Sequence, residues 1–152
     1  MYNEYIPMVK LSYVADFNVK ISEREKITTS KQAERIFRPL FDIDIIEHHE
    51  LFFIMLLNRA GRLLGVKKIS EGGVTGTVVD PKIIFQAAIL CNAQNIILCH
   101  NHPSGNLEPS PQDRAITKKV IEAGKLLDIH ISDHLILTSE SFYSFADESI
   151  MY

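Results

Sequence analysis

The chain lacks the features that mark several specialised classes of protein. Its 152 residues include only two cysteines, seven glycines and six prolines. Two cysteines form no disulfide framework, and so little glycine and proline excludes a collagen-like or low-complexity chain. The longest strongly apolar run, residues 51–57, has seven residues, whereas a membrane-spanning helix needs roughly 20. We therefore expect one globular domain in the reducing cytoplasm, with no membrane segment.

Positive charge is also scarce. The 16 basic side chains are outnumbered by 19 acidic ones, so the formal net charge is −3. Non-specific binding to nucleic acid depends on clustered positive charge. Direct nucleic-acid binding is therefore not expected. The first ten residues, MYNEYIPMVK, contain no apolar stretch of the kind found in a secretory signal peptide.

The order of helical and extended patterns predicts an α/β fold. Alternating or continuous apolar residues predict strands at 8–21, 51–57, 62–69, 95–99, 130–137 and 142–145. Helix-start signals stand near Ser30, at Asp80-Pro81 and at Ser110-Pro111. The elements alternate without strict βαβ regularity, so we expect an α+β arrangement, a curved mixed sheet flanked by helices. Residues 1–29 are expected to form an N-terminal extension, and residues 30–152 the domain.

The chemistry of the chain is concentrated between His100 and Asp113. In an extended backbone, residues i and i+2 point to the same face, so His100 and His102 can present their imidazoles side by side. Imidazole is a favoured zinc ligand, and a catalytic zinc takes three protein ligands and leaves one position open. Asp113 is the carboxylate best placed to join them. Glu108 is a competitor, but it lies in the intervening loop.

The same residues also have a purely structural interpretation. A His-x-His pair at a strand end commonly faces solvent. Ser110-x-x-Asp113 fits a capping box, with Pro111 at the preferred first position of the helix. The two interpretations are compatible, because the start of a helix is a rigid platform for both Ser110 and Asp113.

The full pattern resembles a known family signature. His100-x-His102, seven residues, and Ser110-x-x-Asp113 resemble the JAMM (MPN-plus) metalloprotease motif. The segments NHPSG at 101–105 and DHLI at 133–136 are similar to those of the bacterial RadC branch. The resemblance extends from about residue 30 to the C-terminus. It implies a JAMM-type fold related to cytidine deaminases, with a curved sheet between helices.

The resemblance also implies roles for particular residues. It assigns one Zn²⁺ per chain to three ligands, His100, His102 and Asp113. Glu50 matches the upstream glutamate of the family and would be the general acid and base, with Glu47 as the alternative. Ser110 would stabilise the oxyanion. Asp133 and His134 are candidates for orienting a ligand, and Cys99 is expected to point away from the site and pack in the core.

A site of this composition would activate water. Two neutral imidazoles and one carboxylate leave a net charge of +1 on the zinc centre, which lowers the pKa of bound water toward roughly 7. The resemblance thus implies a zinc metallohydrolase that cleaves a peptide or isopeptide bond in a peptide or protein conjugate. Segments 71–79 and 103–109 are expected to form the rim of its cleft.

Two other functions remain open from the sequence. The chain could be a non-catalytic zinc-binding interaction module, or a factor associated with DNA repair or mobile elements. RadC proteins commonly carry an N-terminal helix-hairpin-helix module, and residues 1–29 are too few to form one. The chain therefore resembles a short form with the metal domain alone. The sequence does not fix its oligomeric state, and a homodimer is compatible with it.

Overall fold

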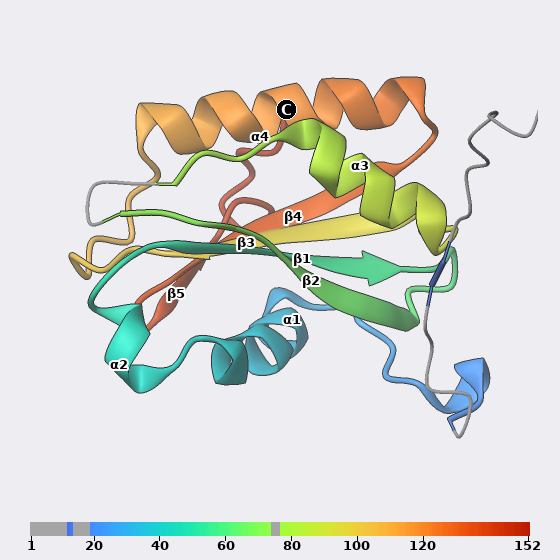
Figure 1. Ribbon diagram of the computed structural model, residues 1–152, viewed down its shortest axis with the longest axis horizontal. Coiled ribbons are helices and arrows are strands. Elements are labelled where there is room, and N and C mark those ends of the chain that lie inside the picture. Colours follow the sequence, from blue (N-terminus) through green and yellow to red (C-terminus); the bar gives the residue numbers. More distant parts are fainter. Residues whose placement is uncertain (1–11, 14–18, 74–76) are drawn as a thin grey trace, which may run out of the picture.

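The centre of the molecule is an open five-stranded mixed sheet (Figure 1), seen in a computed structural model that describes residues 12–13, 19–73 and 77–152. The strands lie in the order β2–β1–β3–β4–β5. Their bounds are β1 Leu51–Leu57, β2 Leu63–Glu71, β3 Asn95–Asn101, β4 His130–Leu137 and β5 Phe142–Ser144. Only β3 and β4 pair in parallel. The predicted fold class, a mixed sheet flanked by helices, is confirmed.

Helices cover both faces of this sheet. Their bounds are α1 Ser30–Phe37, α2 Ile43–Ile46, α3 Pro81–Leu90 and α4 Pro111–Leu126, with 3-10 turns at Ile21–Glu23 and Arg38–Leu40. Helices α3 and α4 lie on one face, and α1 and α2 lie on the other (Figure 1). The predicted extended segment 8–21 falls mostly outside the described residues. Within the described ranges, no helix combines the length and apolarity needed to cross a bilayer.

The sheet separates two apolar cores. Along β1, Phe52, Ile54 and Leu56 pack with α3 and α4, whereas Phe53 and the alternating residues around it pack with α1. All seven residues of β1 are buried, since both faces of the strand are covered. The core on the α4 face ends, at the carboxyl end of β3, in a group of polar side chains.

An irregularity in β4 decides which of its side chains face α4. The pairing of β3 with β4 shifts so that Ile96 opposes Ile131 while the next residue, Ile97, opposes Asp133. Ser132 is therefore an extra residue on β4, as in a β-bulge, and it reverses the alternation of the following side chains. Ile131 packs in the core on the α4 face, and after the bulge it is His134 that faces α4.

Capping residues set where the helices begin. Asp80 caps α3, and its side chain accepts a hydrogen bond from the backbone N–H of Lys82. Ser110 caps α4, with Pro111 at the first helical position. Both starts agree with the sequence prediction. Helix α1 begins at Ser30, but Thr29 is its cap and forms a capping box with Gln32.

A close approach at the end of α4 gives a test of the fold. A Cβ atom at Gly124 would lie 2.4 Å from the carbonyl oxygen of Ile129, whereas a Cβ at Gly65 would have no neighbour within 4 Å. We expect Gly124→Ala to lower the free energy of unfolding by about 1–3 kcal/mol, although alanine favours a helix by about 1 kcal/mol. Gly65→Ala is the matched control and should lose nothing in urea denaturation. Equal stability of the two variants would contradict the close approach.

Candidate metal centre

Three side chains converge where β3 ends and α4 begins. His100 Nε2 lies 3.0 Å from His102 Nε2. The two oxygens of Asp113 lie 3.1 Å from His100 Nε2 and 3.2 Å from His102 Nε2. The group could hold a metal ion, since its ligand atoms all lie within 4.8 Å of one another. The competing carboxylate Glu108 is exposed in the loop and lies outside this group.

The spacing of these atoms fits a first-row divalent metal. Ligand atoms at about 2.0–2.1 Å from a tetrahedral ion are separated from each other by roughly 3.3 Å. The separations of 3.0–3.2 Å among His100, His102 and Asp113 are close to that value. Two imidazole nitrogens and one carboxylate oxygen are also a donor set that such metals accept. The residues present therefore fit a metal ion in the type and approximate spacing of their donor atoms.

Strand geometry brings the two histidines together. His100 and His102 are two residues apart at the end of β3, which places them on the same face. His102 continues the pairing with β4, since its N–H donates to the carbonyl of Leu137 at 2.9 Å. The ring of Phe52 stacks on His100 with 5.8 Å between ring centroids and 9° between planes. Cys99 points to the opposite face and is fully buried in the α1 core, which confirms the packing role expected for it.

Asp113 fulfils both interpretations of the sequence at once. Its Oδ2 accepts a hydrogen bond from the Ser110 N–H at 2.7 Å, and its own N–H donates to Ser110 Oγ at 3.1 Å. This is a complete capping box, yet the same carboxylate faces both histidines. Burial favours the neutral acid, but hydrogen bonds with His100 and His102 outweigh burial and hold the pKa of Asp113 well below its usual range. The carboxylate is therefore ionised, as a metal ligand must be.

A backbone contact fixes the tautomer of His102. Its Nδ1 lies 2.6 Å from the carbonyl oxygen of Asn106. A carbonyl only accepts hydrogen bonds, so Nδ1 carries a proton, and in the neutral ring that a metal requires the lone pair is on Nε2, which faces the cluster. Burial lowers the pKa of His102, but the bonds with Asp113 and Asn106 act against burial and the net effect is to raise it.

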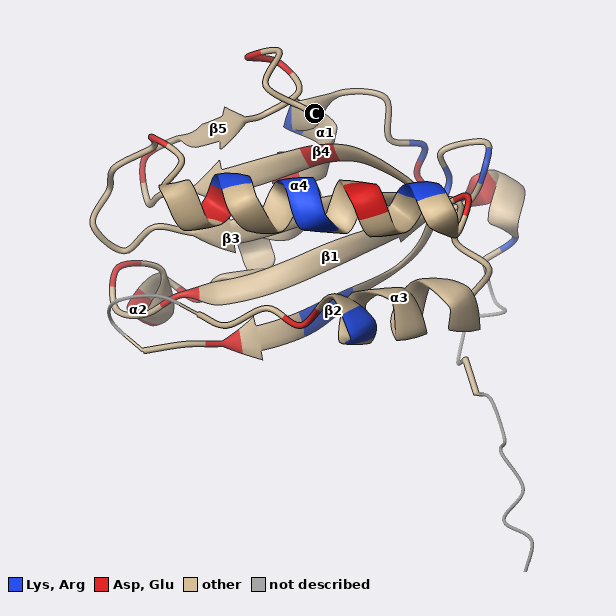
Figure 2. Cartoon of the chain, turned by 90° about the horizontal axis from the view of Figure 1, so that it is seen from above, with Lys and Arg blue, Asp and Glu red and all other residues tan. Residues whose placement is uncertain are grey.

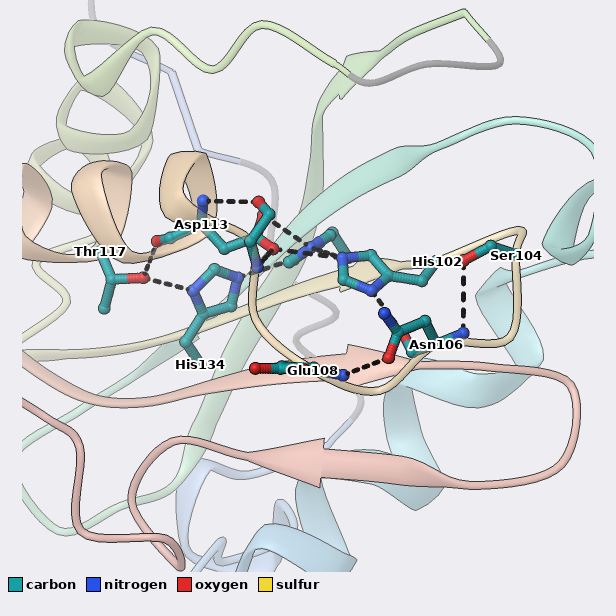
Figure 3. A network of polar contacts seen from close by, with 9 residues as sticks. His102, Ser104, Asn106, Glu108, Asp113, Thr117 and His134 are labelled. Atoms are coloured by element: carbon teal, nitrogen blue, oxygen red, sulfur yellow. Dashed lines mark hydrogen bonds and ion pairs between the residues drawn. The ribbon is translucent and has the colours of Figure 1, made fainter.

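A chain of three hydrogen bonds fixes the tautomer of His100 (Figure 3). Thr117 Oγ1 donates to the backbone carbonyl of Asp113 at 2.5 Å, so toward His134 Nδ1, 2.7 Å away, it can only accept. His134 therefore carries its proton on Nδ1, and its Nε2 accepts from His100 Nδ1 at 2.8 Å. The pKa of His134 lies well below its usual range because of burial and the nearby His100. In the neutral ring of His100 that a metal requires, the lone pair is therefore on Nε2, which faces the cluster.

The structure distinguishes the two residues expected to orient a ligand, His134 and Asp133. His134 contacts His100 directly. Asp133 lies on the other face of β4, where its carboxylate accepts hydrogen bonds from Ser144 Oγ at 2.7 Å and from the Ala146 N–H at 2.9 Å. Burial raises the pKa of Asp133. Contrary to the expectation for this residue, its side chain does not contact the ligand histidines.

Asn101 holds the segment that carries Glu50, a role that sequence reasoning missed. Asn101 stands between the two histidines in the sequence and is fully buried, and its side chain points to the opposite face of β3. Its Oδ1 accepts from the Leu51 N–H at 2.8 Å, and its Nδ2 donates to the carbonyls of Ile46 and His49, each at 2.9 Å. The peptide groups on both sides of Glu50 are therefore fixed. The only sequence feature that could have indicated this role is the asparagine between the two histidines of the His-x-His pair.

Glu50 lies beside the cluster and Glu47 does not. Glu50 lines two cavities that also contact Asp113, and its negative charge helps to raise the pKa of His102. Glu47 is exposed at the end of α2 and lines neither cavity. Ser110 is half-buried and lines the larger cavity. Its oxygen accepts from Asp113, which leaves its hydroxyl hydrogen available to another acceptor.

The two cavities meet at the cluster. One has a volume of about 330 Å³, and the other has about 770 Å³. Both are lined by Glu50, Thr77, Gln112 and Asp113, so together they form a groove past the candidate ligands. The expected rim segments contribute residues 77–79 and several residues of 103–109. Residues 74–76 of the first segment lie outside the described residues.

Comparison with protein families agrees with this geometry. A family model described as "RadC-like JAB domain" matches residues 27–150. The chain belongs to the RadC-like JAB domain family. The match includes all three candidate ligands, together with Glu50 and Ser110.

Relatives of the RadC-like JAB domain occur in several bacteria. A UPF0758 protein of Flavobacterium johnsoniae is 44% identical over 130 residues, 86% of this chain and 56% of that protein. A UPF0758 protein of Porphyromonas gingivalis is 38% identical over 133 residues, 87% of this chain and 57% of that protein. One of Haemophilus influenzae is 32% identical over 145 residues, 94% of this chain and 66% of that protein. The chain thus spans little more than half the length of the first two relatives.

The hydrogen-bond chain through His134 predicts its effect on metal affinity. His134→Phe keeps an aromatic ring beside Phe145 but removes the acceptor for His100 Nδ1, so we expect Zn²⁺ to bind about 10–100-fold more weakly. His134→Gln, whose amide oxygen can still accept, should lose less. Competition with a chromophoric chelator measures the dissociation constants. His130→Gln, at an exposed position of the same strand, is the control. Unchanged affinity in folded His134→Phe would contradict the assigned role.

Proposed function

We propose that this chain is a zinc-dependent metallohydrolase of the JAMM type that hydrolyses a peptide or isopeptide amide bond. The observation that carries the proposal is the convergence of His100 Nε2, His102 Nε2 and the Asp113 carboxylate in an open groove beside Glu50. Membership of the RadC-like JAB domain family supports the same conclusion. In the tautomers fixed by their hydrogen bonds, both imidazoles present a lone pair to one point.

Zinc is the proposed metal, because two imidazoles and one carboxylate are a donor set that catalytic zinc sites use. Catalytic zinc sites use three protein ligands from imidazole and carboxylate groups, and they leave a further position for water or substrate. The described ligand group contains three residues, and its open side faces the groove. Bound zinc would polarise the scissile carbonyl and lower the pKa of a bound water molecule.

Glu50 and Ser110 supply the remaining chemistry. The carboxylate of Glu50 takes a proton from the attacking water and later gives it to the leaving amine, as the carbon–nitrogen bond breaks. The hydroxyl of Ser110 donates a hydrogen bond to the carbonyl oxygen as negative charge develops on it, and one such donor is typically worth about 3 kcal/mol. Ser110 is held for this role by the capping box, which uses its oxygen but not its hydroxyl hydrogen.

The proposed substrate is a peptide or a protein conjugate. The groove is open and extends on both sides of the candidate ligands, as a continuous chain requires.

Metal content tests the ligand assignment. We expect the purified protein to contain about one zinc ion per chain, because three protein ligands with fixed donor atoms converge on one point. His102→Ala should remove the bound zinc, since it deletes one of the three ligands. Elemental analysis after exhaustive dialysis measures the content, and circular dichroism confirms folding. His48→Ala, at an exposed histidine outside the cluster, is the control and should keep its zinc. Full zinc retention in His102→Ala would rule out the assigned site.

Hydrolysis tests the role of Glu50. Glu50→Gln keeps the shape of the side chain but cannot accept a proton, so hydrolysis of a fluorogenic peptide and isopeptide panel should fall by at least about 100-fold. Its zinc content should not change, because Glu50 is not a ligand. Glu47→Gln is the matched control and should retain activity. A zinc-loaded wild-type protein that hydrolyses no member of the panel would instead favour a non-catalytic zinc-binding module.

A further inference from the structure

The smaller cavity lies between α4 and the start of β1, directly beside the ligand cluster. One wall consists of Gln112, Ala115, Ile116 and Lys119, which recur at the spacing of a single helix face. Phe52 and Val79 lie across from them. Asp113 and Glu50 line both cavities, and His100 also lines the smaller one, so anything in the smaller cavity lies next to the candidate ligands.

The chemistry of this cavity is mainly apolar. Phe52, Val79, Ala115 and Ile116 offer only carbon atoms from their side chains. The volume of about 330 Å³ is enough for one medium or large apolar side chain and a short length of backbone. An apolar side chain that enters it leaves water, which stabilises the bound state in proportion to the area removed.

Lys119 adds a positive charge to this side of the groove. It is exposed, and among the described residues it is the only lysine or arginine that lines either of the two cavities. It stands six residues after Asp113, or about 9 Å along the helix axis, and helical side chains lean toward the N-terminus, here toward the ligand cluster. Figure 2 shows basic and acidic positions interspersed along α4. The larger cavity instead contains the exposed Glu108.

We infer that the substrate places an apolar side chain in the smaller cavity, beside the bond to be hydrolysed, and a carboxylate against Lys119. The inference rests on the proposed function and adds the orientation of the substrate in the groove. A carboxylate in the larger cavity would meet the negative charge of Glu108, so the acidic part of the substrate lies on the α4 side.

Hydroxamates that anchor on the zinc ion test this inference. Four probes are compared on the zinc-loaded protein by calorimetry: acetohydroxamate, 4-methylpentanohydroxamate, 2-isobutylsuccinate monohydroxamate, and the glycine conjugate of the last compound. We expect the isobutyl group to tighten binding at least about tenfold over acetohydroxamate. A carboxylate should add about two- to fivefold, and this part should weaken with salt. If the succinate binds more tightly than 4-methylpentanohydroxamate, the substrate carboxylate is the terminal one of the residue whose side chain enters the cavity. If only the glycine conjugate binds more tightly, the carboxylate belongs to the next residue of the substrate.

Variants on the exposed face of α4 supply the controls. Ala115→Trp should fill the cavity and abolish the gain from the isobutyl group, while acetohydroxamate still binds. Lys119→Ala should abolish the gain from the carboxylate, and Lys118→Ala, an exposed neighbour that lines neither cavity, should not.

If acetohydroxamate binds but the isobutyl group adds nothing to its affinity, the apolar part of the inference is overturned. If Lys119→Ala leaves the carboxylate gain intact, the charged part is overturned. Failure of acetohydroxamate itself would contradict the zinc site and therefore the proposed function.

Discussion

The carboxylate of Asp113 is the group on which the arrangement of the site depends. One of its oxygens closes the first turn of α4 through the Ser110 N–H, while the pair of oxygens faces both histidines at the end of β3. A single side chain therefore fixes where α4 starts relative to the sheet. The rest of the helix follows from that position: Thr117 meets His134 one turn later, and Lys119 comes to line the cavity beside the ligands.

The parts of the site that obey local rules could be predicted from the sequence. Alternation along an extended chain puts His100 and His102 on one face and Cys99 on the other, and the structure agrees. The capping signal at Ser110 locates the start of α4 and thereby positions Asp113. The mixed sheet and the starts of α3 and α4 rest on equally local signals, which is why they were correctly predicted.

The parts that depend on irregular or distant pairing could not be predicted. Whether Asp133 or His134 faces the candidate ligands is decided by the extra residue Ser132, and a bulge of this kind leaves no mark in the apolar pattern. Thr117 gains its place in the hydrogen-bond chain only when α4 packs on β4. Asn101 bonds to a segment about 50 residues earlier in the chain, which no local rule anticipates.

The position of Asn101 has a consequence for thermal motion. Successive residues of β3 serve opposite faces of the sheet: the imidazole of His100 points to the ligand cluster, and Asn101 bonds the backbone on either side of Glu50. The two hydrogen bonds tie the backbone on either side of Glu50 to the strand that carries His100. A displacement of this part of β3 would therefore move the His100 imidazole and the Glu50 segment together.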